Sequence, residues 1–307
     1  MAAVPSNKKS VSNKIKRTTE DKVVDFFVYF IAILIFLLAA YPFWLSIVLA
    51  LNEGKDAQLG GIYFWPRKFT LDNFAELLKD GSWGNALIVT FSRTVLGTVL
   101  TVLFTTIVSY GLSYRDLVGR KVYMTMLIIA MYFSGGIIPY YMVLRTLHLI
   151  NTFWVYIIPS MLNIFYCMVA ISSFQAIPKE LAESARMDGA GEMRIFFRIM
   201  LPISKPLLAT IAIFTAVGQW NSWYDCAFFT QDKSLRTMGY LLMTVINKNS
   251  LGAQTMDAYA ASATVNTVTT LSVQLAVMIV AVAPILVVYP FFQRYIVSGM
   301  TIGAVKG

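Results

Sequence analysis

The sequence predicts an all-α integral membrane protein with six transmembrane helices and both termini in the cytoplasm. Composition is the first reason: 57% of the 307 residues are hydrophobic and only 13% are charged, whereas about 25% are charged in an ordinary soluble domain. The mean hydropathy of +0.65 agrees with this. The second reason is six apolar runs, each close to the ~20 residues that a spanning helix needs. A disordered chain and an ordinary soluble domain are both excluded.

The six apolar runs are separated by polar segments and are therefore distinct candidate spans. The first is much longer than the roughly 7–15-residue core of a signal peptide, and no small-residue cleavage site follows it soon. We expect this run to be retained as a membrane anchor. An amphipathic stretch over 71–78 predicts a short helix in the outer loop that follows. The runs cover residues 26–51, 86–110, 122–141, 153–174, 206–228 and 267–292.

The positions of lysine and arginine set the expected orientation. Most of the 25 basic residues fall in segments that six spans place on one side, and an excess of basic residues marks the cytoplasmic side. The net charge of +9 therefore needs no nucleic-acid partner. We expect a cytoplasmic N-terminal tail over 1–22 and a six-helix transmembrane domain over 23–307, with a cytoplasmic loop over 178–205. Segments 52–85 and 230–266 are the expected outer loops.

Several function classes lack the residues that they require. The cores of the six runs contain no Asp, Glu or Lys, whereas ion-coupled transporters hold ionisable groups near the membrane midplane. The chain has no P-loop, no Ser-His-Asp set and no paired catalytic carboxylates. One histidine and two cysteines cannot build a metal cluster or a disulfide framework. We expect no catalytic residue, no metal and no cofactor bound by this chain, with membrane lipid as its surroundings.

The cytoplasmic loop 178–205 is the most unusual segment. Good helix formers fill 179–188, Gly189 and Gly191 permit a sharp reversal, and 192–199 can form a second short helix. A bent, charged, amphipathic hairpin results, which exceeds the roughly 2–8 residues of a usual helix–helix connection. The alternative is a solvated amphipathic loop without a partner.

The same loop carries a recognisable motif. It reads Glu183-Ser184-Ala185, then Gly189, then Ile199-x-Leu201-Pro202. This spacing resembles the EAA motif of binding-protein-dependent ABC importer permeases, which is Glu-Ala-Ala, three residues, Gly, nine residues and Ile-x-Leu-Pro. Ser184 is the one departure, and it replaces one small residue with another.

Other stretches resemble the carbohydrate branch of that family, the maltose-type and multiple-sugar permeases. The likeness covers residues 85–307 well and the first run loosely. Within it, the run from Gln219 to Trp223 resembles the subgroup that handles oligosaccharides or polysaccharides. The stretches are Ile138-Pro139, Trp220-Asn221 and the tail Gln293-Arg294-Tyr295 with Gly299 and 303–307.

The resemblance implies a type I ABC importer permease fold and a bacterial cytoplasmic membrane location. It implies a permease subunit of an ATP-driven importer that translocates a carbohydrate, either an oligosaccharide or a complex glycan. The implied partners are a second homologous permease subunit, two ATPase subunits that bind ATP and Mg²⁺, and an extracytoplasmic solute-binding protein. The implied ATPase-coupling residues are Glu183, Ser184, Ala185, Arg186, Asp188, Gly189, Ile199, Leu201 and Pro202. The alternatives are an ABC permease for a non-sugar solute such as a peptide, and a stand-alone secondary transporter.

The fifth apolar run supplies candidate residues for the sugar path. If this run is one helix, Trp220, Trp223 and Tyr224 share a face, because residues three and four apart are neighbours. Gln219 and Asn221 flank them with amide groups. Aromatic planes and amides suit the apolar faces and hydroxyl edges of a sugar. The alternative is an aromatic belt that faces lipid.

Two further polar residues lie inside apolar runs. Asn163 either contacts substrate or forms an interhelical hydrogen bond. Arg93 lies about two turns from the outer end of the second run, where it either extends toward the outer headgroups or contacts sugar.

Overall fold

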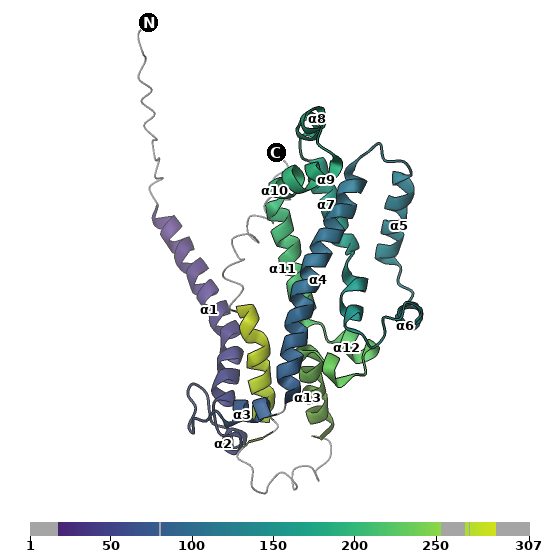
Figure 1. The fold of residues 1–307 in the computed structure, drawn as a ribbon. Helices are drawn as coiled ribbons and strands as arrows, with labels where there is room; N and C mark the ends of the chain where they lie inside the picture. The colour runs from purple at the N-terminus through teal and green to yellow at the C-terminus, as the bar shows by residue number, and fades with distance from the viewer. Residues whose placement is uncertain (1–17, 80, 253–267, 270, 287–307) are drawn as a thin grey trace.

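The computed structural model describes residues 18–79, 81–252, 268–269 and 271–286. Every named element in these ranges is a helix, which confirms the all-α expectation (Figure 1). Residues 293–307 of the carbohydrate-like tail, and most of the expected N-terminal tail, lie outside the described ranges.

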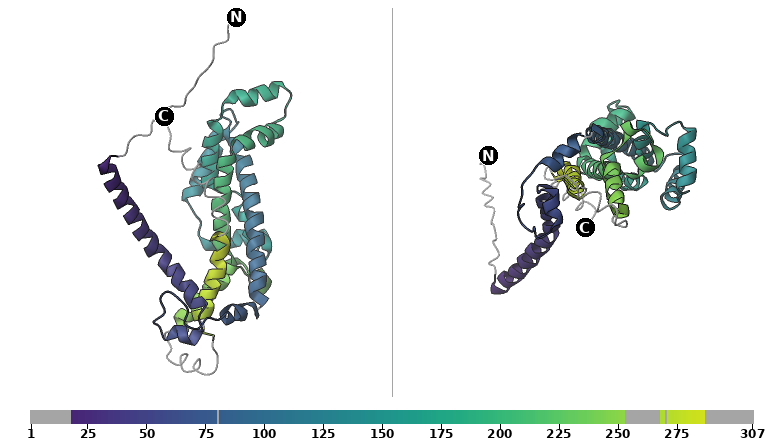
Figure 2. Two further views of the ribbon diagram at one scale, coloured as in Figure 1. Left: turned by 90° about the vertical axis from the view of Figure 1, so that its left-hand side faces the viewer. Right: turned by 90° about the horizontal axis from the view of Figure 1, so that it is seen from below.

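Helix α1 (Thr19–Ala50) starts inside the expected N-terminal tail. A capping box fixes its beginning: the hydroxyl of Thr18 accepts from the backbone N–H of Asp21, whose carboxylate accepts from the backbone N–H of Thr18. The reciprocal bonds satisfy two free N–H groups of the first turn, so the helix begins earlier than residue 26. Its apolar window buries nothing inside the chain, and the N-terminal part of the helix stands away from the rest of the protein (Figure 2). Near its C-terminal end, Val48 and Ala50 are buried.

The centre of the fold is a packed group of three helices. Helix α4 (Gly81–Ser113) lies between α7 (Ile164–Gln175) and α11 (Lys205–Asn221) (Figure 1). Small polar side chains of α4 bond backbone carbonyls of the α7 segment: the Thr101 hydroxyl donates to Ser160 at 3.0 Å, and that of Thr105 donates to Met161 at 3.1 Å. Small residues allow close helix approach, and such bonds hold helices together where lipid replaces water.

Three of the expected spans are interrupted, namely the third, the fourth and the fifth. The third run is not one helix: α5 (Arg120–Tyr132) stops before Gly135 and Gly136, and α6 (Ile137–Thr146) then runs in a different direction (Figure 1). Gly136 has a positive φ of 82°, a conformation that glycine adopts without steric cost. The fifth run also breaks, because α11 ends at Asn221 and α12 (Tyr224–Phe229) begins a new direction.

The fourth run is both bent and interrupted, because residues 161–163 are not helical. It begins as two 3₁₀ turns, η1 (Phe153–Tyr156) and η2 (Ile158–Ser160), and continues as α7 at an angle of 41°. The sixth run contains a helix over Leu271–Leu286.

The outer loops contain more helix than expected. Helix α2 (Gly54–Gln58) precedes α3 (Asp72–Lys79), which confirms the short helix expected over 71–78. Helix α13 (Met238–Gly252) lies within the second expected outer loop, for which the sequence predicted no helix.

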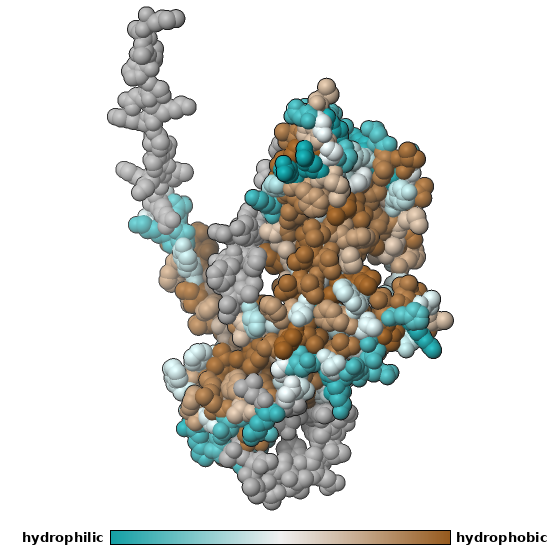
Figure 3. All heavy atoms as spheres, viewed as in Figure 1, coloured by the Kyte–Doolittle hydropathy of each residue, from teal (hydrophilic) through white to brown (hydrophobic). Residues whose placement is uncertain are grey.

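Length and composition allow α1 and α4 to cross a membrane unaided. Two bent pairs, η1–η2 with α7 and Glu192–Ile203 with α11, raise the number to four if each pair is one span. Brown, apolar residues cover the middle of the molecule, and polar residues gather at α8 and at the opposite end (Figure 3). This pattern is typical of a protein that is surrounded by lipid at mid-height.

Candidate functional site: a helical hairpin and a polar cleft

The segment after α7 forms the expected hairpin. Helix α8 (Lys179–Met187) is followed by Gly189 with a φ of 79° and by α9 (Glu192–Ile195). The positive φ explains the sharp reversal, since residues with a Cβ are strained there. Together α8 and α9 project from one end of the three-helix centre (Figures 1 and 2).

The motif residues divide between an exposed face and a packed face of this hairpin. Glu183, Ser184 and Asp188 are exposed. Ala182 is buried, and Ala185 packs with it against the core cluster of α7 and α11. The hairpin is therefore attached firmly on one side while its acidic and small polar side chains face outward.

The second arm of the hairpin is longer than the sequence predicted. Helix continues from Glu192 to Ile203 through a π-turn, η3 (Phe196–Met200), and α10 (Leu201–Ile203). Pro202 cannot donate the backbone hydrogen bond that residue 198 would accept, and a wider π-turn is one way for a helix to accommodate this. After Ser204 the chain bends by 82° into α11.

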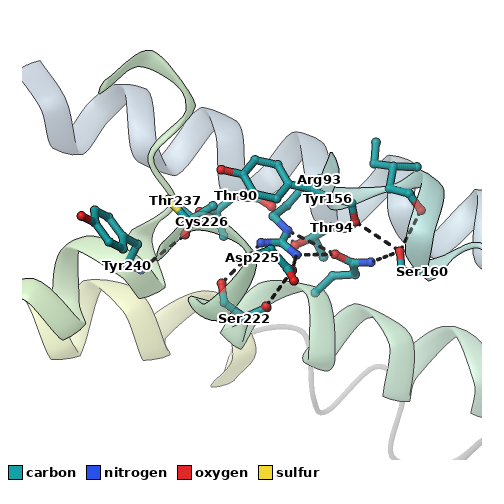
Figure 4. Close-up of polar contacts among 12 residues, drawn as sticks. Thr90, Arg93, Thr94, Tyr156, Ser160, Ser222, Asp225, Cys226, Thr237 and Tyr240 are labelled. Atoms are coloured by element: carbon teal, nitrogen blue, oxygen red, sulfur yellow. Dashed lines mark hydrogen bonds and ion pairs between the residues drawn. The ribbon is translucent and has the colours of Figure 1, made fainter. Parts of the chain in front are cut away.

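A second polar site lies within the three-helix centre, around Arg93 of α4 (Figure 4). The Arg93 side chain is 1% exposed, and its Nη2 lies 2.8 Å from Oδ2 of Asp225. Nε and Nη2 donate to Oε1 of Gln219 at 3.1 and 2.9 Å. The guanidinium carbon lies 4.4 Å from the ring centre of Tyr156. Arg93 thus joins α4 to α11, α12 and η1, and the expectation that it extends toward the headgroups is wrong.

Gln219 connects this ion pair to the end of η2. Its Nε2 donates to Oγ of Ser160 at 2.8 Å, while its Oε1 accepts from Arg93. The close approach of the Gln219 side chain to α4 depends on Gly97, because a Cβ at that position would lie 2.9 Å from Nε2 of Gln219. Glycine on α4 therefore makes room for the amide.

A cleft of about 250 Å³ opens beside these groups. Arg93, Gln219 and Asp225 contribute charged and amide groups to it, and Phe214 and Tyr166 contribute aromatic surface. Asn163 also lines the cleft, while its side-chain oxygen caps α7 by accepting from the backbone N–H of Tyr166. The cleft is therefore lined mainly by polar side chains that can donate or accept hydrogen bonds, with a smaller aromatic surface beside them.

The other candidates of the fifth run are not gathered at this cleft. Trp220 is buried on another side, where its Nε1 donates to the backbone oxygen of Ala281 at 2.9 Å. Asn221 is the exposed last residue of α11. Trp223 and Tyr224 follow the break and stack edge to face on each other. The expected shared helical face is wrong, because it required one continuous helix through residue 222.

Sequence reasoning missed the partners of Arg93. Asp225, Ser160 and Gly97 were not among the expected site residues, and only the charge pair offered a signal. An arginine and an aspartate in apolar runs are most cheaply buried as a pair, so the two charges could have been matched. Nothing in the spacing indicates which serine or glycine completes the cluster.

Comparison with known proteins identifies the class of this chain. No protein-family model matches it. Protein LplC of Bacillus subtilis (strain 168) is 35% identical and covers 85% of this chain and 88% of its own length. The polygalacturonan/rhamnogalacturonan transport system permease protein YtcP of the same strain is 32% identical and covers 94% of this chain and all of its own. The chain therefore belongs to the permease subunits of carbohydrate ABC transporters.

A solved structure has the same fold. One chain of a bacterial ABC transporter involved in the import of the acidic polysaccharide alginate matches with a TM-score of 0.81 and 24% identity, over 91% of this chain and 98% of that one. The resemblance found in the sequence is thus confirmed. The relatives favour the carbohydrate permease over the two alternatives, a permease for a non-sugar solute and a stand-alone secondary transporter.

Proposed function

We propose that this chain moves an oligosaccharide or a complex glycan across the bacterial cytoplasmic membrane as one of two paired permease subunits. ATP and Mg²⁺ bind to two separate ATPase subunits, and an extracytoplasmic binding protein delivers the sugar. The observation that carries the proposal is the hairpin of α8 and α9, which presents Glu183, Ser184 and Asp188 of the expected coupling motif on its exposed face. YtcP, the relative that is 32% identical to this chain, is named as a polygalacturonan/rhamnogalacturonan transport system permease.

The hairpin receives the ATPase subunits in this proposal. Glu183, Ser184 and Asp188 are exposed for docking, and Gly189 sets the turn. Arg186 is turned inward instead, since its Nε lies 2.7 Å from Oε1 of Glu192. Arg186 therefore acts within the hairpin, and the outward residues make the polar contacts.

Six spans with both termini inside remain our proposed topology. The beginning of α1 and the hairpin lie toward the same end of the molecule (Figure 2), which supports a common cytoplasmic side. In this topology α5 and the stretch after it serve as the third span. The helix Leu271–Leu286 contributes the sixth.

The cleft beside Arg93 is our proposed part of the sugar path. Gln219 and Asn163 line it with amide groups, and Tyr166 offers an aromatic surface. We retain Trp223 and Tyr224 as path residues beyond the break because both are partly exposed, at 38% and 41%. Trp220 supports the path from behind through its bond to Ala281.

Uptake by the reconstituted importer tests the proposal. Proteoliposomes would contain this chain, its second permease and its ATPases, with ATP inside and the binding protein outside. We expect ATP-dependent uptake of at least one probe among oligogalacturonides, rhamnogalacturonan fragments and neutral oligosaccharides. Omission of the ATPase subunits should abolish it. Uptake without ATP, or uptake of peptides but of no sugar, would contradict the assignment.

A further inference from the structure

A second polar cluster lies at the inner end of α4, where the helix meets the hairpin. Tyr110 and Tyr114 come from α4 and the residue after it, Arg186 from the last turn of α8, and Glu192 from the first turn of α9. We call these four residues the latch. They come from segments that are 72 to 82 positions apart in the chain, and their side chains converge on one carboxylate.

The latch is closed by five polar contacts. Glu192 accepts at Oε2 from the hydroxyls of Tyr110 and Tyr114, at 2.8 and 3.0 Å. It accepts at Oε1 from Nε of Arg186 at 2.7 Å. Nη2 of Arg186 donates to the Tyr114 hydroxyl at 2.6 Å, and the two hydroxyls are 2.5 Å apart. Hydrogen bonds to an ionised group are about twice as strong as neutral ones. The Glu192 side chain is 54% exposed, so solvent weakens each contact and the junction depends on all of them together.

The latch also has an apolar foundation. The ring of Tyr110 contacts Phe174 of α7 and Phe196 of the second hairpin arm, with ring centres 6.0 and 5.2 Å apart. Tyr110 is 7% exposed and belongs to the core cluster that includes Ala182. Packing of the Tyr110 ring therefore holds the α4 side of the latch in place independently of the hydrogen bonds of its hydroxyl.

Only two helices, α7 and α11, are joined to the hairpin through the chain and would move with it for that reason alone. The chain runs from α7 into α8 and from α10 into α11, whereas α4 has no chain connection to the hairpin. Yet α4 carries Arg93, the centre of the buried polar cluster. Residues 93 and 110 lie on one unbroken helix, about 25 Å apart at ~1.5 Å per residue. A rigid attachment of α4 to the hairpin would therefore reach the cleft.

We propose that the latch ties the coupling hairpin to α4, so that movement of the ATPase subunits reaches the Arg93 cluster directly. Glu192 is the central positioning residue, and Arg186, Tyr110 and Tyr114 orient it. The proposal rests on the proposed function, because it requires the hairpin to receive the ATPase subunits. It adds that the hairpin and α4 move as one body during the ATP cycle.

The test removes only the α4 side of the latch. The double variant Tyr110→Phe/Tyr114→Phe loses two hydroxyls, keeps both rings and leaves the exposed face of the hairpin unchanged. Tyr132→Phe is the matched control, since that side chain is 77% exposed. Spin labels would be attached at Lys179 on α8 and Val118 beyond α4, both exposed positions, in an otherwise cysteine-free complex. Pulsed electron spin resonance then measures their separation without nucleotide and with MgATP and vanadate.

For the wild type and for Tyr132→Phe, we expect the distance between the two spin labels to be the same without nucleotide and with MgATP and vanadate. The double variant should keep its ATPase subunits on purification, but its label separation should shift or broaden when MgATP and vanadate are added. An unchanged separation in the double variant would overturn the latch and leave the proposed function intact. Failure of the wild-type complex to retain ATPase subunits would instead overturn the proposed function. A wild-type separation that shifts between the two states would also overturn the latch.

Discussion

Arg93 is a charge that the fold buries almost completely, with a side chain only 1% exposed. Removing an ion from water costs several kcal/mol even after relaxation, and this chain offsets that cost with three kinds of partner. Asp225 supplies an opposite charge, Gln219 an amide oxygen, and Tyr156 an aromatic face. A desolvated cation over an aromatic ring contributes ~2 kcal/mol. The arginine therefore defines how α4, α11 and α12 fit together.

The variant Arg93→Met should destabilise the protein by leaving Asp225 without its cation. Breaking a fully buried pair costs about 3–5 kcal/mol, and we expect less here because the Asp225 side chain is 29% exposed. Thermal unfolding of the purified protein in detergent measures the loss. The double variant Arg93→Met/Asp225→Asn should lose less than the sum of the single variants. Strict additivity would show that the pair is not coupled.

Gly97 should tolerate no side chain, in contrast to Gly111 on the same helix. A Cβ at Gly97 would lie 2.9 Å from Nε2 and 3.0 Å from Cδ of Gln219, whereas nothing lies within 4 Å of one at Gly111. Gly97→Ala should displace Gln219 from Arg93 and lower the unfolding temperature. Gly111→Ala should be neutral or stabilising, since alanine is favoured over glycine within helices by roughly 0.5–1 kcal/mol. An equal response of the two variants would argue against a close approach at Gly97.

At the scale of elements, the hairpin depends on ionised Glu192. The hydrogen bond from Arg186 is the main cause that lowers the pKa of Glu192 below its usual value of 4.5, with help from Tyr110 and Tyr114. A carboxylate with a lowered pKa contributes stability that is complete above its unfolded pKa and is lost as pH falls through its folded pKa. Acidification below about pH 4.5 should thus loosen the attachment of α8 and α9 to α4.

Hydrogen exchange of the α8 and α9 amides measures this pH dependence. The wild type should lose protection on acidification more steeply than Glu192→Gln, which has no carboxylate to protonate at that position. Identical acid profiles for the two proteins would show that Glu192 does not hold the hairpin.

The turn of the hairpin should require glycine at 189 but not at 191. Gly189 has a φ of 79° and Gly191 a φ of −73°. A residue with a Cβ costs roughly 1–2 kcal/mol in the left-handed conformation. Gly189→Asp should therefore deform the turn and lose the ATPase subunits on pull-down at normal membrane abundance. Gly191→Asp adds the same charge at the N-cap of α9, where aspartate is favoured, and should retain them. Retention by both variants would contradict the role of the turn.

The sequence predicted the hairpin better than it predicted the sugar path, for a physical reason. A glycine turn between two short helices is local, so its residues are sufficient to define it. The aromatic face of Trp220, Trp223 and Tyr224 assumed one continuous helix, but Ser222 adopts an extended conformation with a ψ of 124°. Likewise, the side chains that accept hydrogen bonds from Arg93 lie 126 to 132 residues away, and no local pattern encodes such a contact.

Hydropathy located the long helices but not all of their ends or interruptions. The apolar runs of α1 and α4 were recognised, and the structure extends them at both N-terminal ends. The interruption between α5 and α6 was missed because hydropathy continues through it. Gly135 and Gly136 were its only sequence signal, and glycine is common within membrane helices.

At the scale of the whole molecule, the chain has two functional ends joined by one helix. The hairpin lies at the inner end and the Arg93 cleft lies further along α4, which contacts both α7 and α11. Helix α1 leaves its apolar surface exposed over most of its length, so it requires lipid or another subunit around it. These features agree with the permease subunits to which the chain belongs. In our proposed function, ATPase docking and sugar passage lie at different heights of the same bundle.

The central claim is that the exposed face of α8 docks on an ATPase subunit, and site-directed photocrosslinking tests it most directly. A photoreactive amino acid would replace Ser184 on that face, with Lys68 in the opposite outer loop as the control position. Cells that produce the complete importer would be irradiated, and the adducts would be identified by mass spectrometry. We predict an adduct with an ATPase subunit from position 184 and none from position 68. Absence of an ATPase adduct from position 184, in an importer that assembles and transports normally, would contradict the account.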